Sequence, residues 1–204
     1  MKISVVAVVL AGGRARRLGG RDKALISVHG RRLIDRCIAA LKPHCQHIAL
    51  SVQPENSWAK DYGLPLLYDR PAPKMGPLGG IAAALHWASE QDPQPDWVIT
   101  TPVDLPFIPT DLIVRLTGQE ADVAVASSGR QTHYPVAAWT PSLSAPLENF
   151  LNNGTQSVQE FQSGYSVATV NWEASAFDPF FNINTPQDLS TAEDIEKNIM
   201  AKKT

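Results

Sequence analysis

The apolar segment at residues 3–11, with the two glycines that follow it, constrains the fold of this chain more than any other feature. Five of its nine residues are β-branched, which favours a strand buried on both faces. Gly12 and Gly13 allow a tight turn whose backbone N–H groups stay accessible. A buried strand that ends in such a turn predicts a parallel sheet with a ligand site beyond its carboxyl end.

The same segment, preceded by Lys2, also has the outline of a short secretory signal. Arg14, Arg16 and Arg17 argue against this interpretation, because they stand where a cleavage site needs small neutral residues. No apolar run reaches the roughly 20 residues that a membrane helix requires. We therefore expect a cytoplasmic protein without a membrane partner.

The composition favours one globular domain and excludes several classes of protein. The chain has 204 residues, of which 18 are basic and 20 acidic, so its net charge is −2. Without a basic excess, a nucleic-acid partner is not expected. Cys37 and Cys45 are too few for a disulfide scaffold or a four-cysteine zinc site. We expect a single domain over residues 1–200 and a short tail at 201–204.

Apolar strand-like segments alternate with amphipathic helical segments along the chain. This alternation predicts an α/β protein, a Rossmann-like three-layer α/β/α sandwich with a mostly parallel central sheet. Thr110 and Thr185 are expected to cap helices, the second with Pro186 at its first position. Strands are predicted at 3–10, 47–52, 65–68, 97–101, 122–127, 136–139 and 166–170, and helices at 31–41, 76–89, 110–116 and 186–200.

The loop after the first strand predicts a polyphosphate ligand. Five basic residues follow the glycine pair within ten positions, and such a loop suits an anion. The loop contains neither a Gly-Lys-Ser/Thr sequence nor a G-x-G-x-x-G sequence, which disfavours P-loop ATPases and nicotinamide dehydrogenases.

Two aspartates and a second glycine segment follow other predicted strands at the same edge. Asp104 lies between Pro102 and Pro106, and a single carboxylate there suits Mg²⁺ held jointly with substrate phosphates. Asp69 follows the strand at 65–68 and is either a turn former or a ligand contact. The segment 76–80 opens a helix with small residues that could approach a ligand closely.

These motifs together resemble the MobA-like nucleotidyltransferases, and within them the molybdenum cofactor guanylyltransferases. The resemblance covers nearly the whole chain. Its motifs are Leu10-Ala11-Gly12-Gly13-x-x-x-Arg17-Leu18-Gly19-x-x-Lys23, Gly76-Pro77-Leu78-Gly79-Gly80, Pro102-Val103-Asp104-Leu105-Pro106, His133-Tyr134-Pro135 and Phe181-Asn182-Ile183-Asn184-Thr185-Pro186.

The resemblance implies transfer of GMP from GTP to molybdenum-bound molybdopterin, with release of pyrophosphate and formation of the guanine dinucleotide cofactor. It implies Mg²⁺ as cofactor and molybdoenzyme chaperones or apo-enzymes as further partners. In the site it implies catalytic roles for Arg17, Lys23 and Asp104, with Asp104 also the metal ligand. It implies nucleotide binding by Leu10, Ala11, Gly12, Gly13, Lys23, Ser51, Asp69 and Asp104, and binding of the second substrate by Gly79, Gly80, Asn182 and Asn184.

Ser51 departs from the resemblance, because the family commonly has asparagine there. A hydroxyl is shorter than an amide and lacks its fixed pair of donor and acceptor. Two alternatives stay open at this point. One is a cytidylyltransferase or sugar-1-phosphate nucleotidyltransferase of the same fold, and the other is a non-catalytic GTP-binding module that docks partner enzymes.

Overall fold

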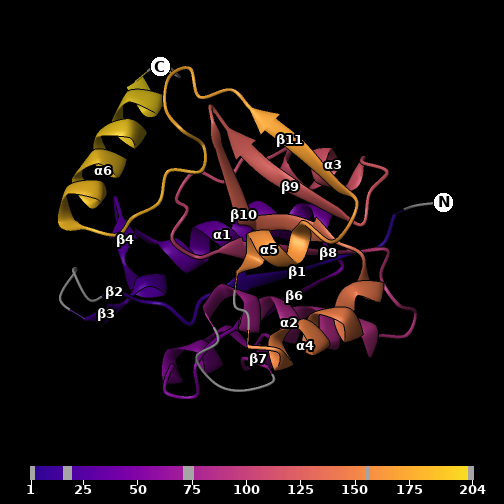
Figure 1. Cartoon of the computed structure of the whole chain (residues 1–204). Coiled ribbons are helices and arrows are strands. Elements are labelled where there is room, and N and C mark those ends of the chain that lie inside the picture. The colour runs from indigo at the N-terminus through magenta and orange to yellow at the C-terminus, as the bar shows by residue number, and fades with distance from the viewer. Residues whose placement is uncertain (1–2, 16–19, 71–75, 155–156, 202–204) are drawn as a thin grey trace.

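The computed structural model describes residues 3–15, 20–70, 76–154 and 157–201, and its centre is a seven-stranded sheet (Figure 1). The strand order is β11-β9-β10-β8-β1-β6-β7. All strands run parallel except β10, which is antiparallel to both of its neighbours. The strands are β1 (Val5–Leu10), β6 (His47–Ser51), β7 (Leu66–Leu67), β8 (Trp97–Pro102), β9 (Val123–Ser128), β10 (Gln131–Trp139) and β11 (Val167–Trp172).

Helices cover both faces of this sheet, which confirms the predicted three-layer α/β architecture. Residues of α1, α3 and α6 pack on one face, and residues of α2, α4 and α5 pack on the other. In Figure 1, α2 and α4 lie side by side on one side of the sheet, and α6 lies on the other. The helices are α1 (Leu33–Leu41), α2 (Gly76–Ser89), α3 (Leu112–Thr117), α4 (Ser144–Asn152), α5 (Val158–Gln162) and α6 (Pro186–Ala201).

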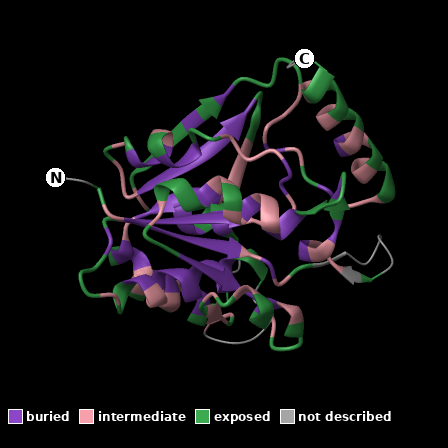
Figure 2. Cartoon of the chain, turned by 180° about the vertical axis from the view of Figure 1, so that it is seen from behind, coloured by how far each residue is buried: buried purple, intermediate pink, exposed green. Residues whose placement is uncertain are grey.

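The side chains of β1 alternate between two hydrophobic cores, as expected for a strand covered on both faces. Val5, Ala7 and Val9 pack into the core that contains α1, whereas Val6 and Val8 pack into the core that contains α2. All five are nearly inaccessible, and the central strands in Figure 2 are buried along most of their length. The first strand therefore contributes side chains to both cores, and this packing fixes the position where the glycine loop begins.

Most predicted elements are present, and the differences lie at their ends. The cap of α3 was predicted wrongly, because Asp111 and not Thr110 precedes that helix, and it makes no side-chain cap bond. Arg31 and Arg32 form the short strand β5, which pairs with β4 (Ser27–Val28), so α1 begins two residues later than expected. The cap of α6 is confirmed, since Thr185 Oγ1 accepts from the N–H of Asp188 at 3.2 Å.

The strand β10 begins earlier than predicted, at Gln131. Pro135 lies inside it, and the register with β9 shifts between His133 and Ala137. Proline has no N–H for the ladder, so a bulge at this position lets the strand continue past it. The helix α6 ends at Ala201, and the rest of the expected tail lies outside the described residues.

Candidate functional site

The register of the sheet aligns the ends of four strands and so builds one edge of a cavity. Leu10 pairs with Ser51 on one side and with Pro102 on the other, and Ser51 pairs with Leu67. Two residues beyond these aligned positions come, in spatial order, Asp104, Gly12, Gln53 and Asp69. Parallel strands thus bring together residues from four distant parts of the chain at one carboxyl edge.

The cavity at this edge has a volume of about 550 Å³, which is enough for a nucleotide-sized ligand. Seven residues given a nucleotide-binding role by the sequence line it directly: Leu10, Gly12, Gly13, Lys23, Ser51, Asp69 and Asp104. Gly80 lines it as well, together with Gly76 and Pro77 of the same helix start. Gln53 and Glu55 also line it, and sequence reasoning did not single them out.

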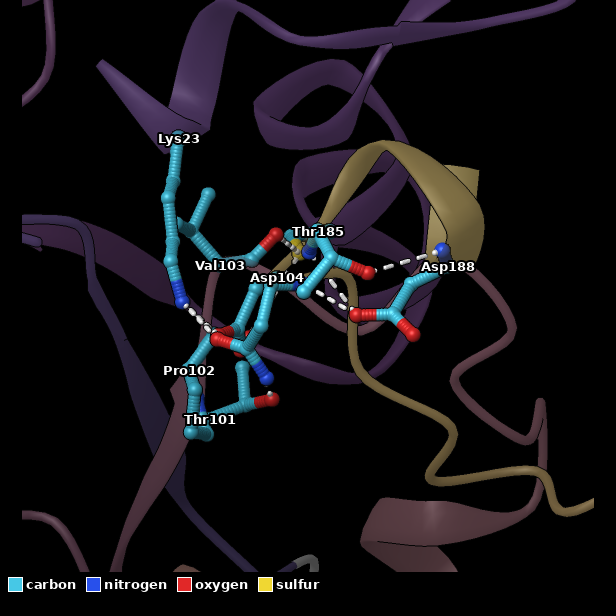
Figure 3. A network of polar contacts seen from close by, with 9 residues as sticks. Lys23, Thr101, Pro102, Val103, Asp104, Thr185 and Asp188 are labelled. Atoms are coloured by element: carbon cyan, nitrogen blue, oxygen red, sulfur yellow. Dashed lines mark hydrogen bonds and ion pairs between the residues drawn. The ribbon is translucent and has the colours of Figure 1, made fainter. Parts of the chain in front are cut away.

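Lys23 and Asp104 form an ion pair at one end of the cavity (Figure 3). Lys23 Nζ lies 2.7 Å from Asp104 Oδ2, and only 16% and 14% of the two side chains are exposed. The same ammonium donates to Asn184 Oδ1. The backbone N–H of Lys23 donates to the carbonyl of Gly13, which ties the lysine to the glycine turn. A largely buried cation thus contacts a largely buried carboxylate at the end of the first loop.

The segment that precedes α6 holds Asp104 and Asn184 in place. Its backbone donates from Ile183 N to the carbonyl of Asp104 at 3.0 Å. Asp188 Oδ2 accepts from the N–H groups of Asn184 and Thr185, which closes a capping box at the start of α6. The N–H of Asn184, with help from Thr185, holds the pKa of Asp188 below its usual value. Figure 3 shows Thr185 and Asp188 facing each other beside Asp104.

Gly80 is required by the close approach of α2 to the end of β6. A Cβ on Gly80 would lie 2.6 Å from Ser51 Oγ, closer than real contacts allow, and 3.0 Å from Leu10 Cδ2, tighter than most real contacts. The first turn of α2 can therefore press against the sheet edge only because this residue has no side chain. Ser51 itself is buried, and its hydroxyl lies at this contact.

Four predicted residues within the described part of the chain do not line the cavity: Ala11, Gly79, Asn182 and Asn184. Ala11 is fully buried, and its N–H donates to the carbonyl of Ser51, so it anchors the start of the glycine loop to β6. Gly79 is buried, and its carbonyl accepts from the N–H of Arg70. Asn182 is exposed and outside the lining. Arg17 lies outside the described residues.

A comparison with known proteins places this geometry in a family. The model of the MobA-like NTP transferase domain matches residues 7–167, which include the glycine loop, Lys23, Ser51, Asp69 and Asp104. The chain belongs to the MobA-like NTP transferase family. The match confirms the resemblance that the motifs indicated.

Relatives of similar length share the molybdenum cofactor guanylyltransferase name. The protein of Rhodopseudomonas palustris strain BisB5 is 41% identical, over 93% of this chain and 92% of its own length. That of Acidiphilium cryptum is 40% identical over 92% and 93%, and that of Shewanella halifaxensis 32% identical over 97% and 100%. All three carry the name molybdenum cofactor guanylyltransferase.

Solved structures of lower identity share the fold. Molybdopterin-guanine dinucleotide biosynthesis protein A from Archaeoglobus fulgidus has a TM-score of 0.73 and 21% identity, over 95% of this chain and 99% of its own. A 2-C-methyl-D-erythritol 4-phosphate cytidylyltransferase from Thermus thermophilus has a TM-score of 0.69 and 22% identity, over 97% and 100%. The fold of this chain is therefore shared by both of these proteins.

The donor set around Asp104 fits the Mg²⁺ that the family implies. Asp104 offers a carboxylate and Asn184 a side-chain carbonyl oxygen, both oxygen ligands of the kind that Mg²⁺ prefers. Within the described part of the chain, no three His, Cys, Asp or Glu residues cluster as a metal cage. Mg²⁺ is usually held by one or two carboxylates plus substrate phosphates and waters, so a cage is not required.

A second polar network lies where β9 ends and β10 begins, and sequence reasoning missed it. Ser128 Oγ lies 2.7 Å from His133 Nε2 and donates to Asp178 Oδ1 at 2.7 Å. Asp178 Oδ1 also accepts from the N–H of Phe180, whose ring packs against that of His133. Burial lowers the pKa of His133 from its usual value, although the nearby Asp178 opposes this effect. The network anchors residues 178–184, the segment that ends at Asn184.

None of the helices described in the structure is long and apolar enough to cross a membrane.

Proposed function

We propose that this protein transfers GMP from GTP to molybdenum-bound molybdopterin and releases pyrophosphate. Relatives that are about as long as this chain and 41% and 40% identical carry this activity in their names, and they support guanylyl rather than cytidylyl transfer. The observation that carries the chemistry is the ion pair of Lys23 and Asp104 at the end of a glycine-lined cavity. A non-catalytic binding module has no need of this pair.

The reaction joins two anions, so the protein must align them and balance their charge. The terminal phosphate oxygen of the acceptor forms a bond to the α-phosphorus of GTP, and the bond from that phosphorus to the β-phosphate oxygen breaks. The electron pair leaves with pyrophosphate. Because the attacking oxygen is already an anion, no side-chain base is needed. Positioning and charge stabilisation supply the rate enhancement.

Lys23 has the charge and the place to stabilise the departing pyrophosphate. Its ammonium donates hydrogen bonds to Asp104 and Asn184. We propose that phosphate oxygens take the place of these two partners when GTP binds, and that Arg17 adds a second positive charge. A cation aimed at the leaving group acts most strongly where charge develops in the transition state.

Asp104 would then hold Mg²⁺ together with the phosphates. Bound Mg²⁺ would supply positive charge that polarises the α-phosphorus and screens the repulsion between the substrates. Release of Asp104 by Lys23 frees the carboxylate for this role. The backbone bond from Ile183 keeps Asp104 in position while its side chain exchanges partners.

We assign the acceptor to the side of Asp104 that faces residues 178–184, opposite the side that binds the nucleotide. Asn184 lies there next to Lys23, and Asn182 is exposed on the same segment. Gly79 and Gly80 belong to the start of α2, and Gly80 lines the nucleotide cavity, so we propose that they border the place where the acceptor meets the nucleotide. The product is a cofactor that other enzymes use, which supports apo-enzymes or their chaperones as partners. GTP is a cytoplasmic nucleotide, which supports a cytoplasmic location.

A product assay with a panel of nucleotides tests this function. The protein is incubated with Mg²⁺, molybdenum-bound molybdopterin and either GTP, CTP or ATP, and the products are identified by mass. The guanine dinucleotide and pyrophosphate are expected with GTP. A larger yield with CTP would favour a cytidylyltransferase. Tight GTP binding without pyrophosphate release would favour a docking module.

A further inference from the structure

Gln53 follows β6, which is separated by β1 from β8, the strand that ends beside the proposed phosphate site. The sheet order at the carboxyl edge places Asp104 after β8, Gly12 after β1, Gln53 after β6 and Asp69 after β7. Neighbouring strands are about 4.8 Å apart, so Gln53 is about 10 Å from Asp104 along this edge. A nucleotide with its phosphates at Lys23 and Asp104 therefore extends its base towards Gln53.

The side chain of Gln53 is held in one orientation. Its Nε2 donates to Asp69 Oδ2 at 3.1 Å, and its amide packs where a Cβ of Gly12 would lie 3.1 Å from Nε2. An ionised carboxylate only accepts hydrogen bonds, so the amide must present its NH₂ group to Asp69 and cannot rotate by 180°. The positions of Nε2 and Oε1 are thereby fixed relative to the cavity.

The backbone of Gln53 is fixed as well. Its N–H donates to Asn56 Oδ1 at 2.7 Å, and Asn56 is 4% exposed. Asn56 Nδ2 donates in turn to Asp22 Oδ1, the residue before Lys23. The loop after β6 is thus tied to the loop that carries the catalytic lysine. Within the described residues, Oε1 of Gln53 makes no hydrogen bond, and the residue lines the cavity.

We propose that Gln53 selects guanine as the base, an inference that rests on the proposed guanylyl transfer. The second hydrogen of Nε2 donates to guanine O6, and Oε1 accepts from guanine N1–H. Adenine carries a donor at position 6 and an acceptor at N1, so it needs the amide reversed. Asp69 prevents that reversal. The hydroxyl of Ser51 can rotate to donate or accept, so it cannot make this distinction.

The test compares Gln53→Met with the wild-type protein by nucleotide affinity in the presence of Mg²⁺ and by turnover with the molybdopterin acceptor. GTP, inosine triphosphate and ATP are the probes, because inosine keeps O6 and N1–H but lacks the 2-amino group. GTP and inosine triphosphate are expected to lose about 10- to 100-fold in affinity, equally, and ATP is expected to change little. Gln187→Met on the exposed surface of α6 is the matched control and should change none of the three.

A second variant tests the orientation without removing the amide of Gln53. Asn in Asp69→Asn can donate or accept, so the amide of Gln53 is free to reverse. The reversed amide matches adenine and not guanine, so the ratio of GTP affinity to ATP affinity should fall, and any loss of ATP affinity itself should be smaller than this fall. An unchanged GTP to ATP ratio in both variants would overturn the proposal, and so would an equal loss for all three nucleotides in Gln53→Met.

Failure of the proposed function gives a different result. A wild-type protein that forms no dinucleotide with any nucleotide contradicts the guanylyl transfer, whereas the affinity ratios still decide the role of Gln53. Preference of the wild-type protein for CTP in both binding and turnover contradicts both.

Discussion

On the nucleotide side of Asp104, the cavity is lined by residues that directly follow parallel strands. Gly12, Gln53 and Asp69 each stand two positions beyond a register-aligned residue, so the sheet itself sets their spacing. On the other side, residues 178–184 belong to no strand or helix. Two hydrogen bonds hold this segment. Asp178 accepts one from the hydroxyl of Ser128, and the N–H of Ile183 donates the other to the carbonyl of Asp104. One side is therefore positioned by backbone ladders and the other by a few isolated hydrogen bonds.

This difference indicates how each side responds to substitution. A strand end is anchored by the ladder and by two hydrophobic cores, so replacing one loop residue there removes chemistry without moving its neighbours. A segment held by two or three hydrogen bonds moves when one of them is lost. We therefore expect variants on the nucleotide side to alter binding and rate directly, and variants on the other side to alter positioning.

Asp104→Asn should give the largest effect, because Asp104 is the boundary of the two sides. The amide keeps the size of the side chain but loses the charge that pairs with Lys23 and would hold Mg²⁺. We expect turnover to fall by about 10³-fold or more, measured as pyrophosphate release at saturating GTP and Mg²⁺. The melting temperature should stay close to that of the wild-type protein, because the backbone contact with Ile183 is unchanged. Near-normal turnover would remove Asp104 from the metal role.

Lys23→Ala should lower turnover by about 10²-fold, the usual loss when a group that stabilises developing charge is removed. Lys60, which is exposed, gives the matched control Lys60→Ala. If Lys23 acts on the leaving group, turnover falls more than GTP affinity. An equal fall in both would instead assign it to ground-state binding of the triphosphate.

The contrast between the two sides also explains which features the sequence could predict. The central strands were predicted because β-branched residues concentrate in them, as in β1 and β8. Asp104 was recognisable because it follows β8, and Asp69 because it follows the predicted strand at 65–68. The helices α4 and α5 were missed, since they are short and carry Asn, Gln and Ser, which favour turns as often as helices.

Two polar groupings could not be predicted, for a physical reason. Gln53 follows a predicted strand, but a glutamine there has no pattern that separates it from any exposed polar residue, and only the structure brings its amide to Asp69. Ser128 and Asp178 are 50 positions apart and meet because β9 ends beside the segment before α6. Such contacts depend on tertiary structure, which residue spacing does not encode.

Ser128→Ala should separate the two sides, because Ser128 bonds to Asp178 and His133 and to no residue that lines the cavity. Loss of the hydroxyl loosens residues 178–184 and with them Asn184. We expect turnover to fall by about 10-fold through misplacement of this segment. GTP affinity should remain within about two-fold, because the nucleotide side is anchored by the sheet. Ser163→Ala, a change at an exposed serine, is the control. An equal loss of GTP affinity would contradict the division of the site at Asp104.

The smallest expected effect is a pH dependence of stability that arises from His133. Burial lowers its pKa in the folded protein, so the unfolded chain binds the proton more readily. The stabilisation is therefore complete above the usual histidine pKa of 6.5 and is lost as the pH falls from there through the lowered value. His133→Gln keeps a polar partner for Ser128 but does not titrate. Melting temperatures measured between pH 8 and pH 5 should fall more steeply for the wild-type protein than for His133→Gln. Parallel curves would mean that the imidazole is as easily protonated in the folded protein as in the unfolded chain, so that the network on this side of Asp104 is insensitive to pH.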